Sequence, residues 1–412
     1  MRQVKLGAIT DLISSNVDKK SRADEQNVRL VNYTDVYYGS VLTSSHDYMQ
    51  ATATPQQIER VGVHHGDVIF TKDSETPDDI GIPAIIDSPD TDMVCGYHLT
   101  IARPHQEFVV PKYLYWYLDS AIAKRYWEQT ANGVTRFSIG SAATSALPIL
   151  LPPLPTQRAI ADYLDRETAE IDGMRADLDE MERLLEERRV SIIQRHVLPE
   201  TETYTRIKLV ADVSLGKTVQ KTQKDSLEVL RNYVRAAHIQ PHGRLILDDQ
   251  PMWFTPNELK QLTLEAGDVL VVEGGAGYGR SVYLREGLPG WGFQNHVIRV
   301  RPLAGASGRF IDYTIRAHYG AGLIDILADG ATIPGLSSDK ARELPILNVS
   351  YAEQRRIADE IDRETAEIDS MLEDITKLRD LLAERRAAVI SAAVTGQIDI
   401  PVSPTHKDEP HA

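Results

Sequence analysis

The octapeptide DRETAEID occurs twice in this chain, as Asp165–Asp172 and again as Asp362–Asp369. The two copies lie 197 residues apart in a sequence of 412 residues. Solenoid units recur at about 20 to 50 residues, so this spacing is too long for a solenoid. The sequence therefore predicts two similar halves, each of which carries one copy of the octapeptide.

The likeness between the two segments continues on both sides of the octapeptide. Gln157-Arg158 matches Gln354-Arg355, and Glu187-Arg188-Arg189 matches Glu384-Arg385-Arg386, both at the same offset. Apolar residues recur in alternating steps of four and three, which is the heptad pattern of a coiled coil. Each helix is expected to run for about 40 residues, or about 60 Å. In the first copy this seam reads Ile160, Leu164, Glu167, Ile171, Met174, Leu178, Met181, Leu185, Arg188 and Ile192.

Two such helices in one chain are expected to bury their seams against each other as an antiparallel coiled coil. An antiparallel register with Glu167 opposite Arg385 brings Arg188 close to Glu364, so that both seam carboxylates gain a guanidinium partner. The alternative is that each seam packs on a globular domain or on a helix of another protein.

The segments outside the helices are predicted to be mixed α/β (α+β) domains with small sheets. Short β-branched runs such as VLVV at Val269–Val272 are separated by glycine and proline turns, and Gly-Asp-Val occurs in each half, at 66–68 and 267–269. The prolines of LPPLPTQ, Ser350 and Gly396 mark the helix ends. The expected order is a first domain at 1–155, a central helix at 156–198, a second domain at 199–352, a distal helix at 353–396 and a flexible tail at 397–412.

Composition narrows the class of protein. No apolar run approaches the roughly 20 residues that cross a bilayer, so no membrane association is expected. The single cysteine, Cys95, excludes an internal disulfide and fits a reducing, cytoplasmic location. The net charge of −15 disfavours a nucleic-acid partner on the simplest interpretation. However, residues 197–353 carry only −1, whereas the helical segments 157–196 and 354–396 carry −4 and −3, so local basic patches remain compatible with the sequence.

The chain resembles the specificity subunit of type I restriction-modification systems. The resemblance covers essentially the whole chain and rests on LPPLPTQRAIADYLDRETAEID, its second copy LPILNVSYAEQRRIADEIDRETAEID, and the Gly-Asp-Val strand in each half. It implies a non-catalytic protein whose two target-recognition domains, held on paired helices, each read one half of an asymmetric, bipartite site in double-stranded DNA. Because the two domains differ in sequence, the half-sites are expected to differ too.

The resemblance also implies the partners. Two methyltransferase subunits are expected to dock on the repeated helical segments, and restriction/translocase subunits complete the system. S-adenosylmethionine, ATP and Mg²⁺ are expected to serve those partners, and no cofactor, metal or catalytic residue is expected in this chain. The sequence has no Gly-x-x-x-x-Gly-Lys-Ser/Thr phosphate loop, and EGGAGYGRS at Glu273–Ser281 departs from the dinucleotide spacing.

DNA contacts are expected from basic and hydrogen-bonding side chains on loops. Any one of them is more often a solvated surface charge than a base reader. The candidates for DNA contacts are Lys19, Lys20, Arg22, Lys72 and Arg136 in the first domain, and Lys217, Lys221, Lys224, Arg231, Tyr278 and Arg280 in the second.

An alternative function is a coiled-coil adaptor whose globular halves bind proteins rather than DNA.

Overall fold

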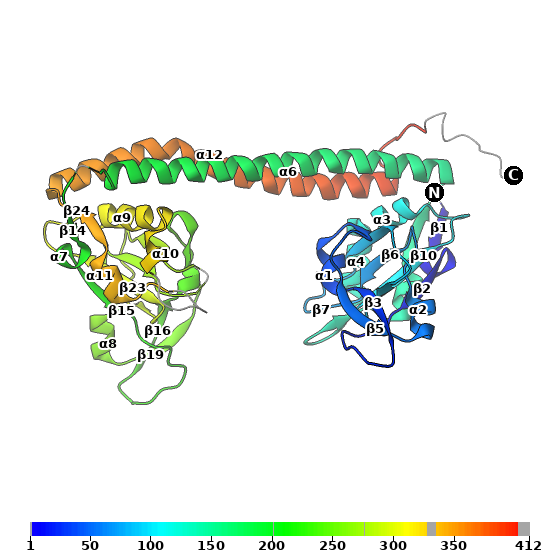
Figure 1. The fold of residues 1–412 in the computed structure, drawn as a ribbon, viewed down its shortest axis with the longest axis horizontal. Coiled ribbons are helices and arrows are strands. Elements are labelled where there is room, and N and C mark those ends of the chain that lie inside the picture. Colours follow the sequence, from blue (N-terminus) through cyan, green and yellow to red (C-terminus); the bar gives the residue numbers. More distant parts are fainter. Residues whose placement is uncertain (1, 201, 276, 328–334, 403–412) are drawn as a thin grey trace. The chain divides into compact units, whose positions relative to one another are not determined.

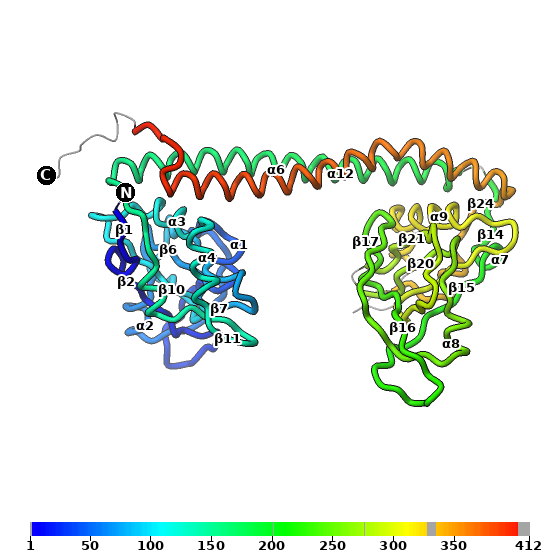
Figure 2. Tube along the Cα trace, turned by 180° about the vertical axis from the view of Figure 1, so that it is seen from behind, coloured from blue at the N-terminus to red at the C-terminus, as the bar shows by residue number. Residues whose placement is uncertain are grey.

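The computed structural model describes residues 2–200, 202–275, 277–327 and 335–402, and the chain divides into two compact units. Unit 1 comprises Met1–Leu178 and Lys377–Ala412, and unit 2 comprises Asp179–Thr376. Each unit therefore contains one mixed domain together with parts of both long helices, α6 and α12 (Figures 1 and 2).

The first domain contains thirteen strands, five short helices and one 3₁₀ turn among the described residues. The elements are β1 (Arg2–Lys5), η1 (Leu6–Ala8), β2 (Thr10–Ser14), β3 (Gln26–Val31), α1 (Tyr33–Tyr38), β4 (Val41–Thr43), β5 (Met49–Ala53), α2 (Pro55–Val61), β6 (Val68–Thr71), β7 (Asp73–Ser74), β8 (Pro83–Ser88), β9 (Met93–Cys95), β10 (Leu99–Pro104), α3 (Pro111–Asp119), α4 (Ala121–Thr130), β11 (Asn132–Gly133), β12 (Phe137–Ser138), α5 (Ser141–Ala146) and β13 (Pro148–Leu151).

The second domain follows the same plan after α6 (Leu154–Val197), and α12 (Tyr351–Thr395) comes after it. Its elements are β14 (Tyr204–Arg206), α7 (Ile207–Val210), β15 (Ala211–Leu215), β16 (Val229–Val234), η2 (Ala236–His238), β17 (Ile239–Gln240), η3 (Pro241–Gly243), β18 (Arg244–Leu245), β19 (Pro251–Phe254), α8 (Pro256–Gln261), β20 (Val269–Val272), β21 (Ser281–Tyr283), β22 (Gly292–Phe293), β23 (Val297–Pro302), α9 (Gly308–Gly320), α10 (Leu323–Leu327), α11 (Ser338–Glu343) and β24 (Pro345–Leu347).

The principal sheets of the two domains correspond. In unit 1 the strand order is β2-β10-β6-β8-β4, and in unit 2 it is β15-β23-β20-β21, with antiparallel pairing except between β4 and β8. A second sheet, β5-β3-β9 or β19-β16-β22, contains one parallel pair in each unit. The predicted small-sheet α/β domains and the Gly-Asp-Val strands, β6 and β20, are confirmed.

The core of each unit extends into the long helices. In unit 1, Leu164 of α6 and Val394 of α12 are fully buried in the same cluster as Trp127 and Tyr113. In unit 2, Ile361 of α12 is likewise fully buried. Burial of each such side chain contributes about 1.5 to 3 kcal/mol. The seam therefore packs on the mixed domain of each unit as well as on the opposite helix.

One carboxylate of each octapeptide fixes a domain to its helix. Asp165 accepts hydrogen bonds from Trp116 Nε1 at 2.9 Å and from Lys112 Nζ at 2.5 Å, both on α3. Asp362, its counterpart, accepts from Tyr313 Oη and from an Arg309 guanidinium nitrogen, both on α9. The four partners also lie 197 residues apart in pairs, so the geometry is repeated although the residues differ.

The glutamine before each octapeptide makes a second repeated contact. Gln157 accepts a hydrogen bond from the Val110 amide at 2.8 Å, and Gln354 accepts from the Ser307 amide at 2.9 Å. Each glutamine also donates to the backbone just before its own helix, at Pro152 or Val349. Because both glutamines are buried, these bonds fix the entry angle of each helix against its domain.

The antiparallel pairing of α6 and α12 is confirmed, and one of the two predicted seam pairs is present. Arg385 lies 3.6 Å from Glu167, as expected. The expected pair of Arg188 with Glu364 is wrong, because Glu364 is held by Arg195 at 2.5 Å and His196 at 3.0 Å.

The pair that does repeat is formed by the next arginine of each Glu-Arg-Arg motif. Arg189 meets Asp369 at 3.2 Å in unit 2, and Arg386 meets Asp172 at 3.7 Å in unit 1. Heptad counting therefore predicted one of the two pairs correctly. The repeated pairs use the arginine one position further along the helix, Arg189 or Arg386.

The helix ends differ slightly from the expected ones. α6 begins at Leu154 rather than 156, because Pro155 falls in the first turn, where a missing N–H costs nothing. α12 begins at Tyr351 rather than 353 and ends at Thr395, followed by Gly396 at φ 73°. Within the expected tail, Ile400 packs on the core of unit 1, and residues 403–412 lie outside the described residues. No helix in the described ranges is long and apolar enough to cross a membrane.

Replacing Asp362 by alanine should lower the free energy of unfolding by about 1 to 2 kcal/mol, since it leaves the half-buried Tyr313 hydroxyl and Arg309 without this acceptor. Asp359→Ala is the matched control, because Asp359 pairs with the same arginine but is 55% exposed; its effect should stay below about 0.5 kcal/mol. Urea unfolding, with hydrogen exchange over α9, measures both. Equal effects of the two substitutions would show that Asp362 has no special role.

Candidate nucleic-acid interface

Three of the predicted cations of unit 1 lie on one exposed loop between β2 and β3. Lys19, Lys20 and Arg22 are all exposed, and Arg22 forms an ion pair with Glu25 at 3.2 Å. Lys19 lies close enough to α1 for its charge to lower the pKa of Asp35, opposing the larger effect of burial, which raises it. The loop is therefore adjacent to α1.

Arg136 forms an ion pair with Asp73, the residue that follows Lys72. An Arg136 guanidinium nitrogen lies 2.7 Å from Asp73, and the backbone amide of Ile139 donates to the Lys72 carbonyl at 2.9 Å. The hydrogen bond to Asp73 raises the pKa of Arg136. Lys72 itself is half-buried and donates to the Ser15 carbonyl at 3.3 Å, so its charge is partly used within the domain.

In unit 2 the structure separates Lys217 from Lys221 and Lys224. The Lys217 ammonium group donates to the Trp253 carbonyl at 3.0 Å and to Glu258 at 2.6 Å, and it lies 5.5 Å from the centre of the Phe254 ring. Only 13% of its side chain is exposed. Lys217 therefore anchors the start of the loop between β15 and β16, whereas Lys221 and Lys224 are exposed on it.

Glu228, a buried residue that the sequence did not single out, organises this loop. It accepts hydrogen bonds from the Lys224 amide at 2.6 Å and from Gln220 Nε2 at 2.8 Å. These bonds, the one from Lys224 foremost, hold the pKa of Glu228 below its usual range. The carboxylate is therefore ionised at neutral pH, and it closes the loop that presents Lys221 and Lys224.

The other three candidates of unit 2 lie in different places. Arg231 is exposed on β16, and Tyr278 donates a hydrogen bond to Asp325. Arg280 lines a cavity of about 480 Å³ where α6 meets the domain. The arginines that line this cavity are Arg189, Arg244, Arg280 and Arg316, and its two lining acids are Glu182 and Glu186.

His242 lies at the wall of the same cavity in an unusual backbone conformation, with φ 62°. Burial, and then the neighbouring Arg189, lower the pKa of His242 to about 4, so the imidazole is neutral at pH 7. It lies 2.7 Å from Glu186. The positive charge of the cavity is therefore carried by arginines alone.

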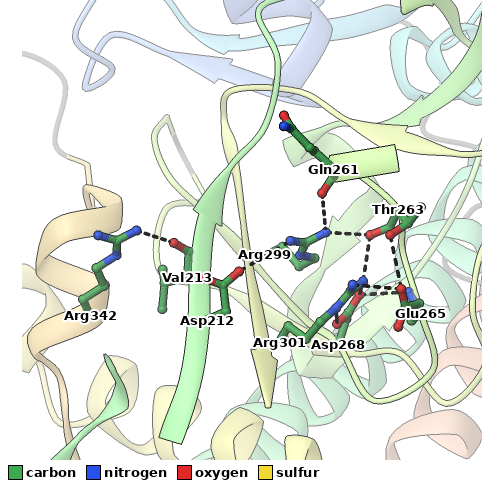
Figure 3. Close-up of polar contacts among 9 residues, drawn as sticks. All are labelled: Asp212, Val213, Gln261, Thr263, Glu265, Asp268, Arg299, Arg301 and Arg342. Carbon is green, nitrogen blue, oxygen red and sulfur yellow. Dashed lines mark hydrogen bonds and ion pairs between the residues drawn. The ribbon is translucent and has the colours of Figure 1, made fainter. Parts of the chain in front are cut away.

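Arginine contacts join strands β15 and β23 of the main sheet of unit 2 to the segments around them (Figure 3). Asp268, of the second Gly-Asp-Val, accepts two hydrogen bonds from Arg301 at 2.7 Å each, and Asp67 and Arg103 repeat this pair in unit 1 at 2.8 Å. Arg342 donates to the Val213 carbonyl of β15 at 2.6 Å.

Arg299, at the centre of this network, has no charged counterpart in the first domain. Its guanidinium donates to the carbonyls of Gln261 and Thr263 at 2.9 and 2.8 Å, and only 6% of the side chain is exposed (Figure 3). Burial, followed by the like charge of Arg301, lowers its pKa. These contacts join β23 to the loop before β20. Arg299 also lies 3.6 Å from Asp212 of β15, the strand that precedes the loop with Lys221 and Lys224.

The predicted cations therefore form local groups rather than one site. Lys72 and Arg136 are close together in unit 1, and Lys221 and Lys224 share a loop in unit 2. In the part of the chain that the structure describes, no group of three or more His, Cys, Asp and Glu residues is arranged to hold a metal ion. The arrangement presents charge and hydrogen-bond donors on a fixed framework, which is what binding to a nucleic acid requires.

Comparison with known proteins agrees with this arrangement. Residues 1–183 match the family model of the Type I restriction modification DNA specificity domain. No curated protein matches the chain. One solved chain, from work on complex assembly and conformational transition of the type I R-M system, is 16% identical with a TM-score of 0.69; the match covers 96% of this chain and 98% of that one.

Two further solved structures are similar at lower scores. The HsdS subunit from Thermoanaerobacter tengcongensis is 17% identical over 96% of this chain and 97% of its own, with a TM-score of 0.48. The S subunit of a type I restriction-modification system from M. genitalium is 14% identical over 95% of each chain, with a TM-score of 0.38.

The structure contains two similar mixed domains with exposed basic loops, and two long helices. Residues 1–183 thus match the type I restriction modification DNA specificity domain, and the chain shares its fold with a solved chain from a type I R-M system. The adaptor alternative, in which both domains bind only proteins, is not favoured.

Replacing Lys221 and Lys224 together by alanine should weaken binding to duplex DNA and reduce the slope of log K against log salt by about 2, because each phosphate contact contributes about 0.9. Lys217→Ala is the matched control, since its ammonium group is used within the domain. It should lower thermal stability and leave the salt slope unchanged. A slope that responds to Lys217 but not to the exposed pair would reverse the assignment.

Proposed function

We propose that this chain reads an asymmetric, bipartite site in double-stranded DNA, with one recognition domain for each half-site. The observation that supports this most directly is the combination of repeated anchors with different exposed elements. Asp165 and Asp362 hold their domains in the same way, whereas helix α1 follows β3 in unit 1, and the 3₁₀ turn η2 and the β17-β18 hairpin follow β16 in unit 2. Different reading elements imply different half-sites.

The two long helices are suited to protein partners rather than to DNA. Each carries a net charge of −4, which repels phosphate. Equivalent exposed apolar residues recur in the two units, which supports docking of two methyltransferase subunits, one in each unit. In unit 1 these are Met174, Leu378 and Leu381, and in unit 2 they are Met371, Met181 and Leu184, each between 37% and 59% exposed.

We assign no catalytic step to this chain. Methylation would be carried out by the methyltransferase subunits with S-adenosylmethionine, and translocation and cleavage by restriction subunits with ATP and Mg²⁺. Because the substrate is cellular DNA, the complete system would act in the cytoplasm. The contribution of this subunit is to choose where the partners act.

A genome-wide map of methylated adenines in the source strain, with the gene intact and deleted, tests the function. We expect one bipartite motif to lose methylation on deletion and to regain it when the intact gene is restored. An unchanged map in a strain whose methyltransferase gene is expressed would contradict DNA recognition and revive the adaptor alternative.

Leu184→Glu and Leu381→Glu, made separately, should each reduce the complex from two methyltransferase subunits to one, because a charge on an apolar contact must be desolvated. The double variant should bind none. Ala387→Glu, an exposed position outside the apolar residues, is the control. Native mass spectrometry of the purified complexes measures the stoichiometry, and two bound subunits in the double variant would rule out this docking surface.

A further inference from the structure

A recess beside α1 in unit 1 has the chemistry of a base-reading site. Its volume is about 390 Å³, and all of its lining residues belong to unit 1. Among the lining residues are Tyr33, Tyr37, Tyr38, Asp73, Asp79 and Arg136.

The Arg136 side chain is held by contacts within unit 1, but more than half of its surface is exposed. One terminal nitrogen, Nη2, lies 2.7 Å from Asp73 Oδ1 and 3.0 Å from His98 Nδ1. Asp73 and His98 are themselves 2.8 Å apart. The guanidinium is 58% exposed, so a planar fork with a fixed orientation still presents donors to the outside. A guanidinium held in this way can offer its exposed N–H donors to the O6 and N7 acceptors of guanine.

The backbone under Arg136 is fixed as well. Arg136 directly precedes β12, whose Phe137 and Ser138 pair with β7. The hairpin needs glycine at position 133, where φ is 151° and a Cβ atom would lie 1.9 Å from the Arg136 carbonyl oxygen. At the hairpin tip, Val134 is 91% exposed.

Aromatic rings form the other wall of the recess. The rings of Tyr33 and Tyr37 are stacked with centroids 5.5 Å apart, and the Tyr37 hydroxyl donates to Asp79 at 3.0 Å. Tyr38 packs edge-on against Tyr37 at 4.9 Å and is 83% exposed. Tyr38 therefore presents an exposed aromatic ring on which a nucleotide base can stack.

Charge decides which part of the DNA fits. The recess contains three carboxylates, Asp73, Glu75 and Asp79, against one arginine, so it repels phosphate. A guanine edge offers acceptors to Arg136, and the paired cytosine offers an amino donor that a carboxylate accepts. The exposed cations Lys19 and Lys20, on the loop adjacent to α1, remain available for the backbone.

We propose that Arg136, oriented by Asp73 and His98, reads the guanine of a G·C pair in the half-site of unit 1, and that Tyr38 contacts the adjacent nucleotide. This inference rests on the proposed function and names the base and the residues that read it. Asp73 and His98 are positioning residues, because they act through Arg136.

The test compares methylation motifs of the complete complex with wild-type chain, Arg136→Ala and Arg136→Lys. Both substitutions remove the fork, so each should relax one G·C position in one half-site about tenfold to hundredfold, while the other half-site stays unchanged. Arg125→Ala, an exposed arginine outside the recess, is the control. Arg136→Lys keeps the charge, so it tests the inference if the alanine variant fails to fold.

Asp73→Asn should relax the same position more weakly, because the fork remains but loses its charged support. Two results would overturn the inference. One is a motif that is unchanged in both Arg136 variants, and the other is a motif that loses base preference equally in both half-sites. If the wild-type complex itself gives no motif that depends on this gene, the proposed function fails instead, and the two failures are thus distinguishable.

Discussion

The carboxylate that begins each octapeptide is the contact on which both units depend. Asp165 and Asp362 are placed by helices with the same sequence around them, and each holds one side of a recognition domain by two donors from a single domain helix. The donors differ, a lysine and an indole in one unit and an arginine and a phenol in the other. Their positions do not differ, so the geometry of attachment is kept while the chemistry of the domain is replaced.

The sequence predicted what depends on local periodicity. Two long helices, their antiparallel pairing and the strands after Gly-Asp follow from heptads, repeats and β-branched runs, and all are present. Heptad counting failed for Glu364, because the facing side chains are long and Arg195 reaches it from the next turns. The helix start at Leu154 was missed because proline was taken as a barrier, although the first turn tolerates it.

The candidate site was less predictable, since it depends on contacts between distant segments. Lys217 and Lys221 lie on one loop and look alike in sequence, but Glu258, 41 residues later, captures only the first. Asp73 and His98 were not recognised as the support of Arg136, because their approach requires three strands to come together. The matching positions of His98 and His296 were the one signal in the sequence that could have identified them. Each approaches an acid at the end of its Gly-Asp-Val strand region.

The repeated clamp also bears on how such a chain can change over evolutionary time. The anchoring residues Asp165 and Gln157 face the domain from the helix, whereas the hairpin with Arg136 belongs to the domain alone. A gene that acquired a foreign domain would keep its helices and its partners if the newcomer presented two donors at the right spacing on one helix. The octapeptide is thus a common attachment point, and a new sequence preference could be inherited by exchange of one domain.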